Sequence, residues 1–175
     1  MTSKQFINAL ANGSVDVIAL LVAVIEKAQA QYCIVGGLAV NAYADPVVSL
    51  DLDVVVSDGA LESICAAAEA AGFSVERFPN SVNLAIGASD LRVQVQTDPR
   101  YQAFLMRAVL RPVLGYALQV AHIEDVLLGK SWAYLDPSRR PSKRQKDLAD
   151  ILRLIEAQPA LRDRVPAELG PHLPV

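Results

Sequence analysis

Two stretches decide the fold: Tyr32-Cys-Ile-Val-Gly36-Gly37-Leu-Ala-Val40 and Asp51-Leu-Asp53-Val-Val-Val56. Apolar, β-branched runs favour buried strands, and the glycine pair favours a turn into a short helix. Because side chains alternate along a strand, Asp51 and Asp53 share one face, with Cα atoms about 6–7 Å apart. The sequence therefore predicts a strand, a glycine turn, a helix and a second strand that carries two carboxylates.

This pattern indicates phosphate and metal chemistry. Two carboxylates on one strand face can share Mg²⁺, which takes oxygen ligands from both protein and phosphate. Gly36 and Gly37 let the backbone approach a phosphate, and the following helix directs N–H groups at it. Asp51 and Asp53 would repel each other unless a metal or a base neutralised them. We therefore predict both as catalytic metal ligands and the two glycines as nucleotide-binding residues.

A family resemblance points the same way. The glycine pair and Asp51-x-Asp53, at this spacing, resemble the signature of the small bacterial polymerase-β-like nucleotidyltransferases. Three later segments resemble motifs of the AbiEii-type toxins of abortive-infection toxin–antitoxin systems: Leu91–Asp98, Ile123–Lys130 and Ser142–Ile151. The resemblance covers residues 30 to 157. It implies an enzyme that uses one or two Mg²⁺ ions to move a nucleotidyl group from an NTP to a hydroxyl of a tRNA-like RNA or of a protein. It also implies a cognate antitoxin as partner.

The same resemblance extends the nucleotide site along the chain. Three bases match distal motifs whose members contact the triphosphate or the acceptor: Lys130, Arg144 and Lys146. Asp147 matches an acid that orients such a base; alternatively, it forms a surface pair with Asp150. Lys130 lies in an apolar helix, where a lysine either reaches for solvent or meets an anion. Ser49 stands where the family often has threonine and can still donate a hydroxyl hydrogen bond.

The family's third carboxylate is missing. In the predicted strand 91–97, Gln94 shares a face with Arg92 and Gln96 and stands where the family places an aspartate. That acid serves as a metal ligand and base, and a neutral amide does neither well. Three interpretations stay open: catalysis with Asp90 or Asp98 as substitute, a degenerate nucleotide-binding or regulatory protein, and a toxin–antitoxin interaction module. The module would bind its partner through the first and the C-terminal helices.

Composition bounds the architecture. The chain has 175 residues and 53% hydrophobic content, enough for one domain with a sizeable core. We expect an α/β (α+β) fold, a short mixed sheet with helices packed on it plus C-terminal helices. Residues 1–135 would form the core with an N-terminal helix, and residues 136–175 a basic helical segment of the same domain. The apolar run 15–25 is too short for a membrane span, and the two cysteines lack metal-ligand spacing, so we expect a cytoplasmic protein without a membrane partner.

The local pattern predicts individual elements. Helices are expected at 14–30, 38–44, 60–71, 99–107, 123–135 and 142–157, and strands at 32–35, 51–56, 73–78, 82–86 and 91–97. Residues 113–120 are expected to form a further short strand or a hairpin. Short turns between the three strands from 73 to 97 favour an antiparallel meander. The proline-rich tail after Pro159 is expected to fray. Charge is uneven, because residues 51–98 hold eight acids and two bases whereas residues 139–164 hold eight bases and four acids. This asymmetry suits a metal–nucleotide beside a polyanion.

Overall fold

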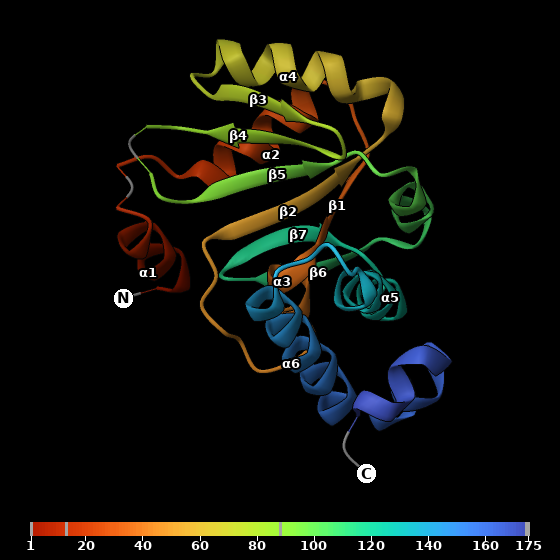
Figure 1. Ribbon diagram of the computed structural model, residues 1–175. Coiled ribbons are helices and arrows are strands. Elements are labelled where there is room, and N and C mark those ends of the chain that lie inside the picture. The colour runs from red at the N-terminus through yellow and green to blue at the C-terminus, as the bar shows by residue number, and fades with distance from the viewer. Residues whose placement is uncertain (1, 13, 88, 174–175) are drawn as a thin grey trace.

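The centre of the molecule is a mixed β-sheet. The computed structural model describes residues 2–12, 14–87 and 89–173. Within these ranges, seven strands form one sheet in the order β3-β4-β5-β2-β1-β7-β6 (Figure 1). The strands are β1 (Tyr32–Val35), β2 (Asp51–Val56), β3 (Ser74–Phe78), β4 (Ser81–Ala85), β5 (Arg92–Gln96), β6 (Val109–Val113) and β7 (Tyr116–Val120). The predicted α/β fold with a mixed sheet is confirmed.

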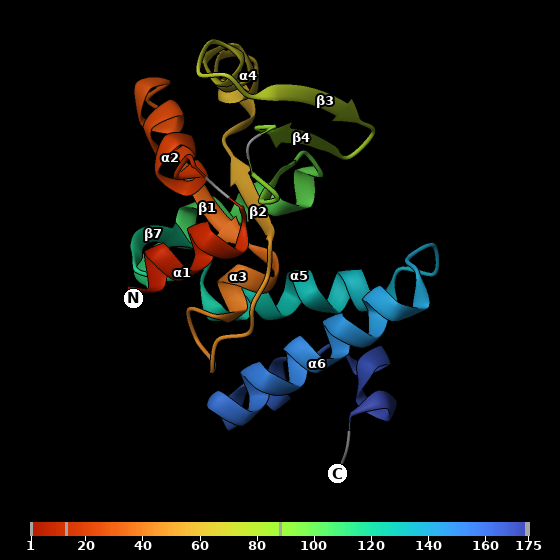
Figure 2. The same cartoon turned by 90° about the vertical axis from the view of Figure 1, so that its left-hand side faces the viewer.

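Helices pack on both faces of the sheet. The α-helices are α1 (Ser3–Leu10), α2 (Val17–Lys27), α3 (Gly36–Val40), α4 (Leu61–Ala70), α5 (Ile123–Leu135) and α6 (Pro141–Ala157). Short 3₁₀ helices are η1 (Asp58–Ala60), η2 (Pro99–Arg107), η3 (Pro159–Arg164) and η4 (Ala167–His172). Helices α2 and α4 lie on one side of the sheet, and α3, α5 and α6 lie on the other (Figure 2). No helix within the described ranges is long and apolar enough to cross a membrane.

Strand β2 sits between an antiparallel and a parallel neighbour. It pairs antiparallel with β1 and parallel with β5, whereas β3, β4 and β5 form the predicted antiparallel meander. Leu52 and Val54 of β2 are fully buried. The alternation predicted from sequence therefore holds: apolar side chains face α2 and α4, and Asp51 and Asp53 lie on the opposite face.

That opposite, polar face is only partly covered. Over β1 and β2 it receives α3, which contacts both strands. Toward the β3 edge it is open to solvent: Glu76, Phe78 and Ala85, which register and alternation place on the face of Asp53, are exposed. This face of the sheet therefore has a roofed half, covered by helices, and an open half toward β3, with β2 between them (Figure 1).

The termini differ from the sequence expectation. Helix α1 was not predicted; a capping box between Thr2 and Gln5 begins it. Helix α2 begins after Asp16, whose carboxylate accepts a hydrogen bond from Ala19 N–H, rather than after Ser14. The expectation that the tail frays after Pro159 is wrong for the described residues, because η3 and η4 bury Leu161 and Leu169. The tail is part of the hydrophobic core.

We predict that Leu169→Ala destabilises the whole domain. Leu169 is 0% exposed, and truncating a buried leucine costs about 2–5 kcal/mol. The matched control is Leu110→Ala, because Leu110 is 65% exposed on edge strand β6 and should change stability by at most about 0.5 kcal/mol. Urea unfolding followed by circular dichroism measures both. Equal midpoints for the two variants would mean that the tail is detached from the folded core.

Candidate functional site

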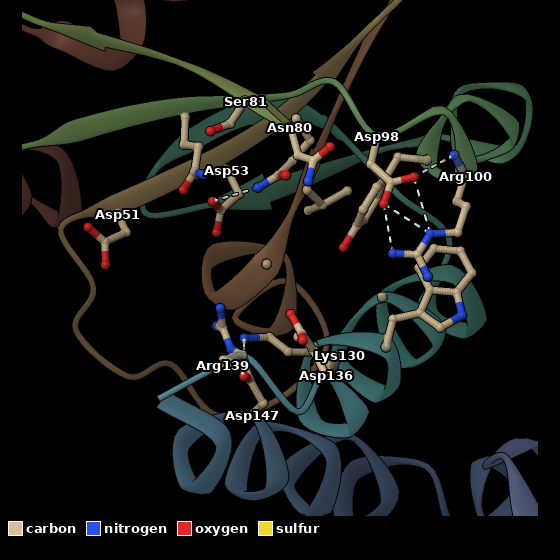
Figure 3. A pocket seen from close by; sticks show the side chains of 18 of the residues that line it. Asp51, Asp53, Asn80, Ser81, Asp98, Arg100, Lys130, Asp136, Arg139 and Asp147 are labelled. Atoms are coloured by element: carbon tan, nitrogen blue, oxygen red, sulfur yellow. Dashed lines mark hydrogen bonds and ion pairs between the residues drawn. The ribbon is translucent and has the colours of Figure 1, made fainter. Parts of the chain in front are cut away.

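The polar face of the sheet borders a cavity of about 1000 Å³. Strands β2, β4 and β5 line one side, and η2, α5 and the start of α6 line the other. Figure 3 shows Asp51 and Asp53 on the sheet side and Lys130, Arg139 and Asp147 on the helical side. The cavity brings together six of the residues predicted from sequence: Gly36, Asp51, Asp53, Gln94, Lys130 and Asp147.

Gly36 lies where no other residue fits. Its φ is +68°, a conformation that L side chains rarely adopt, and a Cβ built on it would lie 2.1 Å from Oδ2 of Asp53. Gly37 differs, because a Cβ there would meet only Oγ of Ser49, at 3.8 Å. The backbone at the end of β1 therefore approaches the Asp53 carboxylate closely, and this approach depends on Gly36 alone.

Asp51 stands at the exposed end of the carboxylate pair. Its side chain is 40% exposed and lies between two bases. Nζ of Lys143, in the first turn of α6, is 3.6 Å from one carboxylate oxygen, and Nε of Arg92, on β5, is 3.9 Å from the other. These distances mark loose, solvent-screened pairs, which a stronger cation could displace.

The Asp53 carboxylate is more enclosed than that of Asp51, and neighbouring positive groups offset its charge less. Its Oδ1 accepts a hydrogen bond of 3.4 Å from Nε2 of Gln96. Burial raises the pKa of Asp53, the charge of Asp51 raises it further, and Lys130 and Arg139 act in the opposite direction. Among the described residues, no basic nitrogen lies within 4.0 Å of the Asp53 carboxylate oxygens. A half-buried carboxylate without a basic partner favours a bound cation.

Lys130 anchors the helical side of the cavity. Its side chain is 8% exposed, and Nζ lies 3.1 Å from Oδ1 of Asp147 and 2.7 Å from Oδ2 of Asp150. Burial by itself lowers the pKa of Lys130, but the two carboxylates outweigh it and leave the pKa raised. Asp147 also accepts a hydrogen bond from Nε of Arg139. The contact between Lys130 and Asp147 that the sequence suggested is present, and Asp150 shares it.

The same ionic cluster extends to the loop before Asp51. Arg153 donates to Oδ1 of Asp150 at 2.8 Å and to Oδ1 of Asn41 at 2.9 Å. Asn41 in turn brackets Val47, accepting from its N–H at 3.0 Å and donating to its carbonyl oxygen at 2.7 Å. Helix α6 is thereby tied to the segment that leads into β2, which couples the position of Asp51 to the helical side of the cavity.

An aromatic cluster closes the far end of the cavity. Tyr101 and Phe104 of η2 meet Trp132 of α5, with ring centroids 5.5 and 5.6 Å away. Arg100 stacks over Trp132 at 4.6 Å and pairs with Asp98 at 2.7 Å. The hydrogen bonds from Arg100 hold the pKa of Asp98 below its usual range. A carboxylate held in this way is a poor proton acceptor.

Gln94 occupies the position predicted for it. On β5, Gln94 is the register partner of Asp53 on the parallel strand β2 and of Asn83 on the antiparallel strand β4. It lines the cavity, so the predicted strand face is confirmed. Of the two acids considered as substitutes, Asp98 is engaged by Arg100, and Asp90 accepts a hydrogen bond from Asn12 outside the cavity lining.

Four predicted nucleotide-binding residues do not line the cavity: Gly37, Ser49, Arg144 and Lys146. Ser49 bonds to the backbone of Asp51, accepting from its N–H at 3.3 Å, and so shapes the start of β2. Arg144 donates to the carbonyl oxygen of Tyr134 at 2.7 Å, which fastens α6 to α5. Lys146 is exposed to solvent. Their nucleotide role stays a prediction.

Sequence reasoning missed other residues that line the cavity, among them Asn80, Ser81, Asn83, Arg92, Gln96, Arg139, Arg140 and Lys143. Arg139 and Arg140 lie in the loop between the predicted helices 123–135 and 142–157, and Lys143 follows it, so these three positive charges could be read from the sequence. Only the packing of α6 against α5 shows that this loop faces Asp51. The amides carry no sequence signal, because a single asparagine on a strand is common at turns and edges.

Comparison with known proteins gives the fold a context. No protein-family model matches the chain, and no curated protein matches it in sequence. Among solved structures, the antibiotic-resistance factor ANT(2'')-Ia is similar at 16% identity, covering 89% of this chain and 94% of that chain with a TM-score of 0.57. The lincosamide antibiotic adenylyltransferase LnuA, solved with lincomycin bound, is 11% identical, with 78% and 95% covered and a TM-score of 0.55.

A third similar structure is an antigenic nucleotidyltransferase-like protein from Paracoccidioides brasiliensis. It is 14% identical, with 85% of this chain and 90% of that chain covered and a TM-score of 0.51. At these identities the similarity shows the fold. The chain therefore has a nucleotidyltransferase-like fold, and its chemistry has to be argued from its own side chains.

We predict opposite outcomes for two adjacent glycine substitutions. Gly36→Ala should weaken nucleotide binding and lower stability by about 1–3 kcal/mol, because it adds backbone strain and a collision with Asp53. Gly37→Ala should keep its stability, since the added methyl meets ordinary contact distances. Thermal unfolding and fluorescent-nucleotide titration test the pair. Equal unfolding temperatures for the two variants would contradict the close approach of Gly36 to Asp53.

Proposed function

We propose that the protein is a nucleotidyltransferase that binds an NTP with Mg²⁺ and transfers its nucleotidyl group to a hydroxyl acceptor. The observation that carries this proposal is the meeting of Asp51, Asp53 and Gly36 with Lys130 in one cavity. The cavity has room for a nucleotide and an acceptor group together, at about 1000 Å³. Paired acids facing a basic wall suit a metal that bridges protein and triphosphate.

The residues present fit Mg²⁺ as a shared ligand. Asp51 and Asp53 offer hard oxygen donors, and Asp53 is a half-buried carboxylate whose charge is only partly offset by neighbouring groups. Among the described residues no group of three or more acidic, histidine or cysteine side chains gathers to hold a metal, in this cavity or outside it, so the protein itself would supply two carboxylates. Mg²⁺ commonly binds through one or two carboxylates and completes its coordination with phosphate and water. When bound, the ion would neutralise charge on the transferring phosphate.

The chain's own residues then divide the work. Gly36 lets the backbone come close to the reacting groups. Arg140 and Lys143 line the cavity from the helical side and would hold the triphosphate by charge, beside Arg139, which is bonded to Asp147. Lys130 would hold the helical side of the cavity in place through Asp147 and Asp150, which largely neutralise its charge. In this role Lys143 would exchange its loose contact with Asp51 for a phosphate.

The acceptor and the biological role are proposed from the sequence. The AbiEii-like segments support a toxin of a toxin–antitoxin system that modifies a tRNA-like RNA or a protein hydroxyl in the cytoplasm, with a cognate antitoxin as partner. ANT(2'')-Ia has been solved with adenylyl-2''-tobramycin, so a small-molecule hydroxyl is an acceptor class for that neighbour.

Gln94 favours a second candidate function. It pairs with Asp53 where a third carboxylate would complete the metal site, and Asp98 is held by Arg100. A protein with this arrangement would bind Mg²⁺ and NTP but turn over slowly or not at all. It would then act as a nucleotide-binding regulatory protein. Binding measured beside turnover separates the two candidates.

We predict that Asp51→Asn and Asp53→Asn each weaken Mg²⁺-dependent NTP binding by at least about tenfold, a loss of about 1.4 kcal/mol. Each change removes one of two charged ligands from the metal. The matched control is Asp90→Asn, which removes a carboxylate that binds Asn12 outside the cavity lining. Isothermal titration at saturating Mg²⁺ measures the affinities. Unchanged affinity in both cavity variants, with the fold intact, would exclude the metal role.

We predict that Gln94→Asp raises transferase activity. The substitution restores a carboxylate beside Asp53 on the same sheet face, and a general base contributes about 10²–10⁴-fold. Single-turnover release of labelled pyrophosphate measures the step. A gain in Mg²⁺ affinity without any turnover would instead support the regulatory function, whereas robust wild-type turnover that the substitution leaves unchanged would mean another group takes the proton.

A further inference from the structure

A second hollow of about 420 Å³ adjoins the main cavity on the open half of the sheet. It is lined by Phe78, Pro79, Asn80, Ser81, Asn83 and Gln94, and its last four members also line the main cavity. We call these six residues the amide floor. None of the described residues that line it carries a charge, which sets it apart from the ionic walls around Asp51 and Lys130.

The amide floor begins next to the predicted metal ligands. Asn83, Gln94 and Asp53 are register partners on the neighbouring strands β4, β5 and β2. Adjacent strands lie about 4.8 Å apart. A small ring bound over Asn83 and Gln94 would therefore lie next to Asp53. The roofed half of the face carries the bases for a triphosphate. The open half is therefore the place left for the acceptor.

The floor has unmet hydrogen-bonding capacity. Oδ1 of Asn83 is buried and has no hydrogen-bond partner within the described part of the chain. Such an orphaned acceptor is costly in a folded protein. Because the terminal torsion of asparagine is soft, the amide can turn its oxygen toward the hollow. A ligand that donates a hydrogen bond there would satisfy it, and each amide offers both donors and an acceptor.

The rim of the floor is apolar. Phe78 ends β3 with 45% of its surface exposed, and Pro79 follows it in the turn to β4. An exposed phenyl ring beside amides gives a flat apolar surface next to paired donors and acceptors. That combination suits a ring that is apolar on its face and polar at its edge.

Charge argues against a cationic occupant. In the proposed function the two acids nearest the floor, Asp51 and Asp53, hold the metal, and Asp98 is paired with Arg100. Glu76 continues the row of Asn83 on β3 but is exposed and lies outside the floor. An amino sugar would therefore find no unpaired carboxylate on the floor itself.

We propose that the amide floor is the acceptor subsite and that it takes a neutral, hydroxyl-bearing sugar ring. This inference rests on the proposed nucleotidyl transfer and names its acceptor class. A ring hydroxyl oxygen forms a bond to the α-phosphorus, the bond from that phosphorus to the bridging oxygen breaks, and pyrophosphate leaves. The hydroxyl proton passes to solvent, because Gln94 cannot accept it.

The test uses the full chain with Mg²⁺ and a non-hydrolysable NTP analogue. The analogue is bound first, and the side-chain amide signals of Asn80, Asn83 and Gln94 are then followed by NMR. Methyl glucoside and methyl glucosaminide form a matched pair that differs by one amino group. Adenosine and a short RNA with a terminal adenosine form the second pair, which distinguishes a free ring from the end of a nucleic acid.

We expect the neutral rings to shift the amide signals and the glucosaminide to bind more weakly than the glucoside. Asn83→Leu should weaken neutral-ring binding by about two- to tenfold, the effect of one hydrogen bond. It should not lower the unfolding temperature, because it removes an unpaired buried oxygen. A merely structural role for Asn83 predicts a lower unfolding temperature instead. The control Glu76→Gln should leave ring binding unchanged.

The outcomes separate the two proposals. If the NTP analogue fails to bind with Mg²⁺, the proposed function is wrong and the acceptor inference falls with it. If the analogue binds but no neutral ring shifts the amides, or the glucosaminide binds more tightly, only the acceptor inference is overturned. Binding of adenosine without the RNA would identify a free ring as the acceptor, and tighter binding of the RNA would identify a terminal ring.

Discussion

The buried charge of Lys130 is the interaction on which the helical side of the molecule depends. Its ammonium lies between Asp147 and Asp150 with only 8% of the side chain exposed. Removing one partner of such a cluster typically costs about 3–5 kcal/mol, because the other charges stay buried without compensation. The cluster fixes α6 against α5, and through Arg153 and Asn41 it also reaches the segment before Asp51. The positions of both walls of the cavity therefore depend on this one ionic cluster.

This arrangement divides the polar face of the sheet by charge. Under the helices, bases from the loop before α6 and its first turn face the carboxylates of β2. Beyond them, β4 offers the amide of Asn83, β5 offers the amides of Gln94 and Gln96 beside Arg92, and the edge strand β3 ends in an exposed phenyl ring. A polyanion fits the first region and a neutral group fits the second. Asp53, partly compensated and held against Gly36, marks the boundary at which two such substrates would meet.

Much of the fold and of the candidate site could be predicted from the sequence, because the features concerned depend on residues that are close together in the chain. The glycine pair, the carboxylate strand and the face of Gln94 follow from local alternation and turn chemistry, and the structure reproduces them. Helix α1 also had a readable signal, the Thr2-x-x-Gln5 capping box. What the sequence could not supply is long-range pairing. That β5 lies parallel to β2, that Asp150 joins Lys130, and that Lys143 reaches Asp51 all depend on how distant segments pack.

The central claim is that a metal–nucleotide binds at Asp51 and Asp53, between the two halves of the sheet face. Paramagnetic broadening of backbone amide signals by Mn²⁺ with a non-hydrolysable NTP analogue locates such a complex directly. The account predicts the strongest broadening at Gly36, at 51–53 and at Lys143, with none at Leu169 in the tail. Broadening centred elsewhere, or none with the analogue at saturation, would contradict it.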